Sequence, residues 1–440
     1  MSGLELNLAF EALNEGSAEE RAAFGLLSMA CGEQVLTEGF DHYARAFRLG
    51  PLVSGYHAAQ WFAWNWWRLR WEGRSSVSDW AFAHHMATIG EGYAWPNVRI
   101  WSDGIRTALI SDASVRPDAK PFRYVGAHPI VISSALFERA LDEFLPKVIA
   151  RLRDQSVPQT NLDKVWEEVL AERSDSEIAK RRRLEALMGR DPDSIDDDAI
   201  ENLVSDCDRL GEEAVNEVAA QQGQKRAIDE KLSARFLEEV AAATGFRSSQ
   251  KDVVALDIGY ITLNNPNKPA WVVGSDVARL LRAQEKLGVD PVDDQLFAQM
   301  CGTSVEALTS RSISQTPISY ALDDARGSGS RVVLTAGHHT GRRFALARVL
   351  GDRLMYRRGA LFPATQGYTY RQKAQRAFAA ELLVPFEALF DMLSGDYSED
   401  GQQDAADHFG VSPMVVNTIL KNRRIIERDL AGEDGLVLAA

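Results

Sequence analysis

Two adjacent histidines and two carboxylates near the end of the chain are residue types that can hold a metal ion. His338 and His339 stand side by side, and Asp352 and Glu381 follow on two predicted helices. Imidazole nitrogens and carboxylate oxygens are ordinary ligands of divalent metals. These four residues form one candidate metal site, although adjacent loop histidines are more often solvated and no general base accompanies them.

The two helices are predicted from apolar residues that recur at three- and four-residue steps. The first has a buried face made of Phe344, Ala347, Gly351 and Leu354. On this helix Arg348 and Asp352 are four residues apart, and an exposed ion pair between them would contribute roughly 0.2–0.5 kcal/mol. The second helix is expected over residues 372–383, and Pro385 ends it.

Three blocks of sequence, in this order, resemble the ImmA/IrrE metallopeptidase family. RFALARVLGD at residues 343–352 is similar to the family's Arg-Phe-x-x-Ala-His-Glu-x-Gly-His helix. FAAELLVP at residues 378–385 is similar to its Phe-Ala-Ala-Glu-Leu-Leu-x-Pro helix, and AADHFGVSP at residues 405–413 opens a helix–turn–helix-like tail. The resemblance covers residues 328–428 and implies a zincin-like fold.

The residues that bind and use zinc in that family are replaced in this chain. In the family pattern, two imidazoles one helical turn apart bind the metal, and the glutamate activates the attacking water. Those places hold Arg348, Val349 and Asp352. A guanidinium cannot coordinate a cation, and valine cannot accept a proton. The family's third ligand is an acidic residue on the next helix, and residues 371–376 carry no carboxylate. We therefore expect no catalytic residue and no cofactor, with zinc only if His338 and His339 build a relocated site.

A tryptophan-rich helix is the other conspicuous feature. Its rings recur at helical spacing, which predicts that one face carries Trp61, Trp64, Trp67 and Trp71. Aromatic stripes of this kind usually form a core. The alternative is an exposed groove for a protein partner, because Trp beside Arg68 and Arg70 has the composition of a binding hot spot.

Composition limits the class of protein. A chain of 440 residues is too long for one core, so several domains are expected. The net charge of −14 opposes binding to nucleic acid or to anionic lipid. Three scattered cysteines, no signal-like start and no apolar run of membrane-spanning length favour a cytoplasmic protein.

The pattern along the chain predicts a largely helical α+β protein with four regions. These are a Trp-rich α+β domain at residues 1–130, a charged helical region at 131–250, a helical linker with a helix–turn–helix-like segment at 251–327, and an ImmA/IrrE-like domain at 328–440. The strand-like runs of the first region are Leu26–Met29, Asn97–Trp101 and Thr107–Ile110. Residues 210–245, rich in Glu, Ala, Gln and Lys, predict a long exposed helix or a connector.

The function expected from these features is that of a catalytically degenerate ImmA/IrrE-like protein that binds another protein. The resemblance implies helix–turn–helix repressors as partners and a role in stress response or mobile-element control. One alternative is a metalloendopeptidase with the relocated site. Another is a DNA-binding regulator, because Arg423 and Arg424 add positive charge to the tail; the acidic chain disfavours it.

Overall fold

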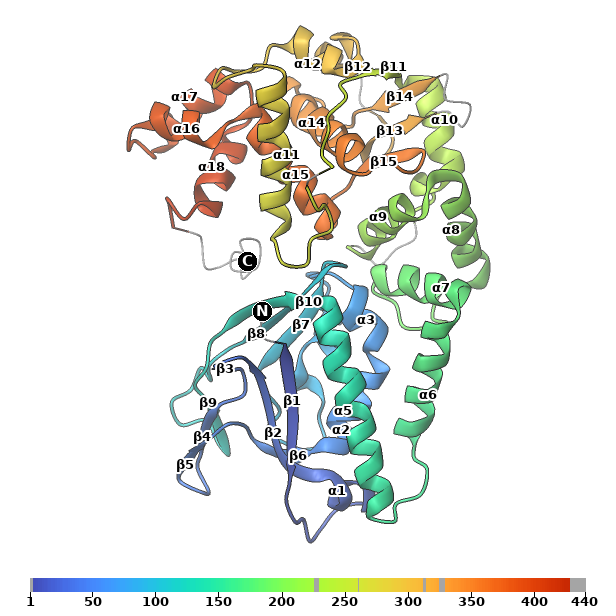
Figure 1. Cartoon of the computed structure of the whole chain (residues 1–440), viewed down its shortest axis with the longest axis vertical. Coiled ribbons are helices and arrows are strands. Elements are labelled where there is room, and N and C mark those ends of the chain that lie inside the picture. Colours follow the sequence, from blue (N-terminus) through green and yellow to red (C-terminus); the bar gives the residue numbers. More distant parts are fainter. Residues whose placement is uncertain (1–2, 225–228, 260, 312–313, 324–328, 428–440) are drawn as a thin grey trace. The chain divides into compact units, whose positions relative to one another are not determined.

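The computed structural model describes residues 3–224, 229–259, 261–311, 314–323 and 329–427. Within these ranges the protein is α+β, as predicted. About half of it is helical, and its strands form four small antiparallel sheets (Figure 1). The chain divides into two compact units, which we call unit 1 (residues 1–196 and 223–226) and unit 2 (residues 197–222 and 227–439).

Three of the sheets belong to unit 1. The largest has the order β1-β2-β3, with β6 also paired to β2, and the others have the orders β10-β8-β7 and β5-β4-β9. The strands are β1 (Leu4–Phe10), β2 (Phe24–Cys31), β3 (Gln34–Val35), β4 (Gly39–Asp41), β5 (Ala46–Arg48), β6 (Leu52–Ser54), β7 (Val98–Ser102), β8 (Arg106–Ser111), β9 (Phe122–Tyr124) and β10 (Pro129–Ser133). β2, β7 and β8 confirm the three predicted strands.

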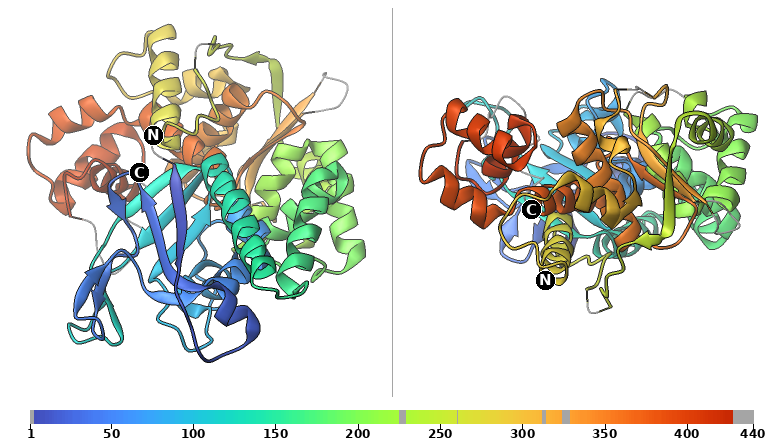
Figure 2. Two further views of the ribbon diagram at one scale, coloured as in Figure 1. Left: turned by 60° about the horizontal axis from the view of Figure 1, so that its bottom comes forward. Right: turned by 90° about the horizontal axis from the view of Figure 1, so that it is seen from above.

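Helices cover the sheets of unit 1. They are α1 (Ala18–Ala23), α2 (Gly55–Trp64), α3 (Trp66–Trp71), α4 (Trp80–His84), the short 3-10 helix η1 (Met86–Thr88), α5 (Ser134–Asp154), α6 (Asn161–Ser174) and α7 (Ser176–Leu187). Figure 2 shows α5 running along β1, with which it is in contact. Its apolar stripe, including Phe137, Leu141 and Leu145, joins the core of unit 1. Because α5 to α7 complete this core, unit 1 extends well beyond residue 130, where the sequence suggested an end.

Unit 2 has one five-stranded sheet of order β12-β11-β14-β13-β15. Its strands are β11 (Phe246–Val253), β12 (Cys301–Thr303), β13 (Ser319–Asp323), β14 (Ser330–Val333) and β15 (Leu361–Ala364). Its helical elements are α8 (Asp197–Leu210), α9 (Glu212–Gly223), η2 (Glu230–Leu232), α10 (Ala234–Thr244), α11 (Ala270–Gln284), α12 (Asp294–Met300), α13 (Glu306–Thr309), α14 (His339–Met355), α15 (Tyr370–Leu383), α16 (Phe386–Leu393), α17 (Glu399–Phe409) and α18 (Pro413–Asn422).

Helix α15 packs against α14 and α11 through small residues. A Cβ atom at Gly351 of α14 would lie 2.5 Å from Cδ1 of Phe378, and one at Gly274 of α11 would lie 2.1 Å from the carbonyl oxygen of Ala374. Only glycine allows the helices to approach this closely. α14 and α15 confirm the two helices predicted over the motif blocks.

Two expectations for the middle of the chain need revision. The charged region at residues 131–250 is largely helical, as predicted, but its helices are shared between the two units. The segment after Met300, expected to be helix–turn–helix-like, instead continues as β12 and pairs with β11. Cys301 is buried and the next two residues are half-buried, and β12 lies at the edge of the sheet. None of the helices in the described ranges is long and apolar enough to cross a membrane.

Candidate functional site

The motif positions of α14 and α15 face each other in the interior of unit 2. The side chain of Arg348 is buried, and its Nη2 donates hydrogen bonds to the carbonyl oxygen of Thr365 at 2.5 Å and to Oε1 of Gln372 at 2.6 Å. Burial, together with the nearby guanidinium of Arg376, lowers the pKa of Arg348 to about 9. Val349, next to it, is packed in the apolar core.

Asp352 of α14 forms a buried ion pair with Arg371 of α15. It is 0% exposed, and its two carboxylate oxygens accept hydrogen bonds from Nε and Nη2 of Arg371 at 2.7 and 2.6 Å. Burial acts to lower the pKa of Arg371, but its contacts with Asp352 outweigh burial and raise it. The predicted pair between Arg348 and Asp352 is therefore wrong: each side chain reaches across to α15 or to the loop before it rather than along α14.

A third charged group, Glu217 of α9, lies in the same interior. Its carboxylate accepts a hydrogen bond of 2.5 Å from the hydroxyl of Thr369, the residue that caps the N-terminus of α15. Burial raises the pKa of Glu217 to about 7; Arg371 and Thr369 lower it, and Asp352 raises it. One turn further, Oε1 of Gln221 accepts a hydrogen bond from the backbone of Gln366. α9 is thus held against the loop before α15.

Sequence reasoning missed Glu217. Its segment predicted an exposed helix or connector because glutamate, glutamine and alanine dominate it. In the structure Glu217 lies within an unbroken run of buried residues, 217–222, so α9 is packed on more than one face. The valine and alanines of this run, Val218, Ala219 and Ala220, were the signal that could have identified a packed helix.

The zinc that the family resemblance implies does not fit these residues. Zinc needs three protein ligands such as imidazole, thiolate or carboxylate, with one position left for water. Here the first of the motif positions on α14 is occupied by the guanidinium of Arg348. Asp352 is the only carboxylate in the block at residues 343–352, and both of its oxygens accept hydrogen bonds from Arg371. The guanidinium of Arg348 donates hydrogen bonds to two carbonyl-type oxygens. It therefore places a positive charge where the resemblance expects the first zinc ligand.

The candidate relocated site is dispersed. His339 contacts Oδ2 of Asp294 at 2.6 Å, and His338 is the N-cap residue of α14. Asp352 is bound to Arg371, and Glu381 takes part in ion pairs with two other arginines. Throughout the ranges that the structure describes, no group of three or more His, Cys, Asp or Glu side chains is placed to hold a metal ion.

The tryptophans of unit 1 divide between core and surface. Trp61 and Trp67 are buried, Trp71 is half-buried, and Trp64 is 60% exposed. The expected single helix is broken at Asn65, whose side chain donates to the carbonyl oxygen of Trp61. Trp64, the last residue of α2, is exposed, whereas Trp66, the first residue of α3, is buried. The expectation of a shared buried face is therefore wrong for Trp64.

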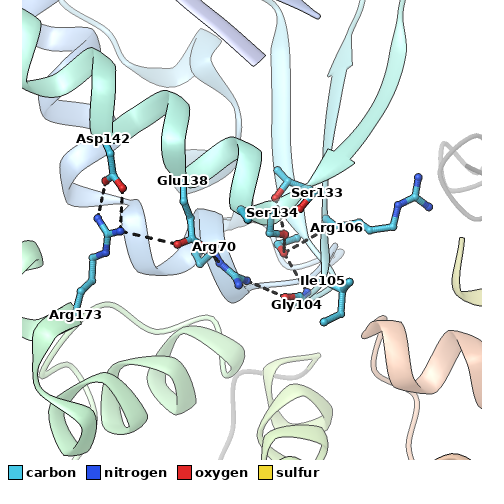
Figure 3. A network of polar contacts seen from close by, with 12 residues as sticks. Arg70, Gly104, Ile105, Arg106, Ser133, Ser134, Glu138, Asp142 and Arg173 are labelled. Atoms are coloured by element: carbon cyan, nitrogen blue, oxygen red, sulfur yellow. Dashed lines mark hydrogen bonds and ion pairs between the residues drawn. The ribbon is translucent and has the colours of Figure 1, made fainter. Parts of the chain in front are cut away.

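A polar network fixes the end of the tryptophan segment (Figure 3). Arg173 of α6 donates two hydrogen bonds to Asp142 of α5 and lies 3.9 Å from Glu138. Glu138 also accepts a hydrogen bond from Arg70 of α3, which donates to the carbonyl oxygen of Gly104 at 2.9 Å. Each arginine is matched by a carboxylate. This arrangement stabilises the packing of three helices and a turn.

In the tail, α17 and α18 form the predicted helix–turn–helix pair. Arg423 is directed inward: its guanidinium lies 4.4 Å from the ring of Phe386, 5.5 Å from that of Trp271 and 3.7 Å from a carboxylate oxygen of Glu381. Arg424 is exposed. Arg423 thus closes the tail onto α11 and α15, and the two neighbouring arginines have different environments.

Comparison with known proteins gives no relative. No family model, curated protein or solved structure matches this chain. The resemblance to ImmA/IrrE peptidases stays a prediction that rests on the three motif blocks.

Proposed function

We propose that unit 2 is a catalytically inactive ImmA/IrrE-like module that acts by binding another protein. The observation that carries the proposal is the buried pair of Asp352 with Arg371, together with the hydrogen bond from Arg348 to Gln372. The resemblance assigns zinc binding and zinc chemistry to these motif positions. The resemblance implies a partner of the helix–turn–helix repressor kind, in stress response or mobile-element control.

The contacts at the motif support loss of catalysis with retention of the fold. A buried carboxylate without a partner would cost several kcal/mol, and Arg371 removes that cost. The hydrogen bond from Arg348 to Gln372 joins α14 to α15, where the resemblance expects a first ligand and, in residues 371–376, a third. An interior stabilised in this way does not need a metal to hold α14 against α15.

Enzymatic assay tests the proposal directly. The full-length protein should release no peptides from casein above the background of a buffer control, in the presence or absence of added zinc. The positive control is an active zinc endopeptidase under the same conditions. Cleavage that the Asp352→Asn variant loses, and that a chelator abolishes, would contradict the proposal.

Rebuilding the zinc site gives a second, independent test. Arg348→His, Val349→Glu and Asp352→His restore the helix motif but leave Arg371 without its partner, so the triple variant should bind zinc weakly at most. Adding Gln372→Glu and Arg371→Leu should raise zinc affinity, because Gln372 already faces residue 348. If these two additions do not increase affinity, the positions do not correspond to a zincin site.

A further inference from the structure

A pocket on unit 2 lies between three helices and is separate from the motif positions. It encloses about 490 Å³ of space open to solvent. α11 contributes Trp271 and Ser275, α18 contributes Ile419, Asn422 and Arg423, and α15 contributes Ala377, Ala380, Glu381 and Val384. We call this pocket the α11–α15–α18 groove. Most of its lining is apolar.

The apolar part of the groove can accept a side chain. Small Ala377 and Ala380 form one wall, and Val384 and Ile419 form the end. Trp271 is half-buried and supplies an aromatic surface. An aliphatic or aromatic anchor residue is the chemistry that gains most from such a lining.

The charges around the groove are positive, in contrast to the rest of the chain. Of the six Lys or Arg residues on the three helices, Arg371 is paired with the buried Asp352, and Arg282 and Arg376 donate to backbone carbonyl oxygens. The others are Arg279, Lys373 and Lys421, and Arg423 follows α18. The same helices carry two carboxylates, Asp276 and Glu381. Arg279 lies 3.8 Å from Asp276 and 2.9 Å from Glu381, and Arg423 lies 3.7 Å from Glu381. These helices therefore carry a small excess of positive charge, in a protein whose net charge is −14. An incoming carboxylate is attracted there.

We propose that the α11–α15–α18 groove binds an acidic peptide segment of a partner protein, with an apolar side chain in the groove and a carboxylate on Arg423. This inference rests on the proposed function and gives the binding module a surface. Duplex DNA fits the observations less well. α17, the helix that precedes α18, carries Glu399, Asp400, Asp404 and Asp407 and no Lys or Arg, so it repels phosphates.

Selection from a random peptide library displayed on phage tests the proposal with the full-length protein as target. Sequences that combine Asp or Glu with a large apolar residue should be enriched, and synthetic copies of them should bind. Arg423→Gln removes the guanidinium, and Ala380→Trp fills the groove; each should weaken peptide binding at least tenfold. Arg235→Gln, an exposed arginine of α10, is the matched control and should leave affinity unchanged.

The outcomes are distinct. Enrichment of basic peptides, enrichment that neither groove variant reduces, or no enrichment at all would overturn the proposal. Binding of a labelled DNA duplex that weakens with Arg423→Gln, without peptide binding, would assign the groove to nucleic acid instead. Circular dichroism of each variant shows that it is folded; if Ala380→Trp does not fold, Arg423→Gln alone decides. Failure of the peptide experiment would not bear on the proposed loss of catalysis, because the casein assay tests that separately.

Discussion

The helical interiors of both units bury charge, but unit 1 combines it with a cluster of aromatic rings. In unit 1, α2 and α3 bury the rings of Trp61, Trp66 and Trp67, and Arg68 of α3 is paired with the buried Glu72 at 2.7 Å. In unit 2, α14 and α15 bury Asp352 and Arg371. An apolar core tolerates loss of one contact in proportion to the area removed, whereas a buried charge is stable only while its partner is present. The comparison predicts that removing one charge of the Asp352–Arg371 pair destabilises the protein more than removing one exposed ring.

The largest effect is expected from breaking the ion pair of unit 2. Asp352→Asn keeps the shape of the side chain but removes the nearest counter-charge of the buried Arg371 guanidinium and leaves Glu213 at 3.9 Å, which should cost roughly 3–5 kcal/mol of unfolding free energy. Urea denaturation of the full-length protein measures it. The double variant Asp352→Leu with Arg371→Leu should recover most of the loss. A single variant as stable as wild type would mean that the pair is not buried.

The tryptophan segment offers a matched pair of substitutions in unit 1. Trp67→Ala should cost roughly 3–5 kcal/mol, because Trp67 is 5% exposed and its Nε1 donates to a carboxylate oxygen of Glu172 at 2.7 Å. Trp64→Ala should change stability by about 0.5 kcal/mol or less, since the ring is 60% exposed. Thermal denaturation compares the two. Equal costs would contradict the exposure of the Trp64 ring.

A smaller effect, dependent on pH, is expected at Glu217. Its pKa rises from 4.5 to about 7 on folding, so the unfolded chain loses this proton at lower pH than the folded protein. The stability that it contributes is fully present below pH 4.5 and is lost as the pH rises through 7. At pH 8, Glu217→Gln should therefore be more stable than wild type, by up to roughly 3 kcal/mol.

Denaturation of both proteins between pH 4.5 and pH 8 measures this difference. The gap between them should close as the pH falls. The control is Glu213→Gln on the same helix, whose side chain is 56% exposed and should give no such trend. A constant difference across the range would contradict burial of an ionisable Glu217.

The smallest effect is expected in the tail. Arg424→Glu changes an exposed side chain and should alter stability by about 0.5 kcal/mol or less. Arg423→Glu should cost more, because it places a second carboxylate beside Glu381 and removes the guanidinium from the ring of Phe386. Thermal denaturation separates the two. A steeply salt-dependent loss of duplex DNA binding in Arg424→Glu would instead support the DNA-binding alternative.

The sequence predicted the elements better than their contacts. Periodic apolar residues located α14 and α15, because this pattern follows from one-sided burial of a helix. Short strand-like runs between Gly, Asp and Pro turn signals located β2, β7 and β8. The partner of Asp352 could not be predicted, since Arg371 lies on another helix and reaches it only in the folded structure. Trp64 was misplaced because its spacing gives the period of the helix but not the width of its buried face: Trp61 and Trp64 lie on the same helix, and only Trp61 is buried.

The charged interior of unit 2 shows the same limit. Glutamate in a charged helix predicts exposure, so nothing in the local pattern assigns Glu217 to the interior. The groove also depends on three helices that are distant in sequence. What the motif residues did predict is their own chemistry: Arg348 and Val349 cannot perform the roles of a zinc ligand and a general base.

The zinc content of the purified full-length protein tests the central claim most directly. Elemental analysis should find far less zinc than one ion per chain, and a chelator should leave the midpoint of thermal unfolding unchanged, because Arg348, Asp352 and Arg371 hold the two helices together without a metal. About one zinc ion per chain, lost in His338→Ala or His339→Ala, would contradict the claim and identify a relocated metal site.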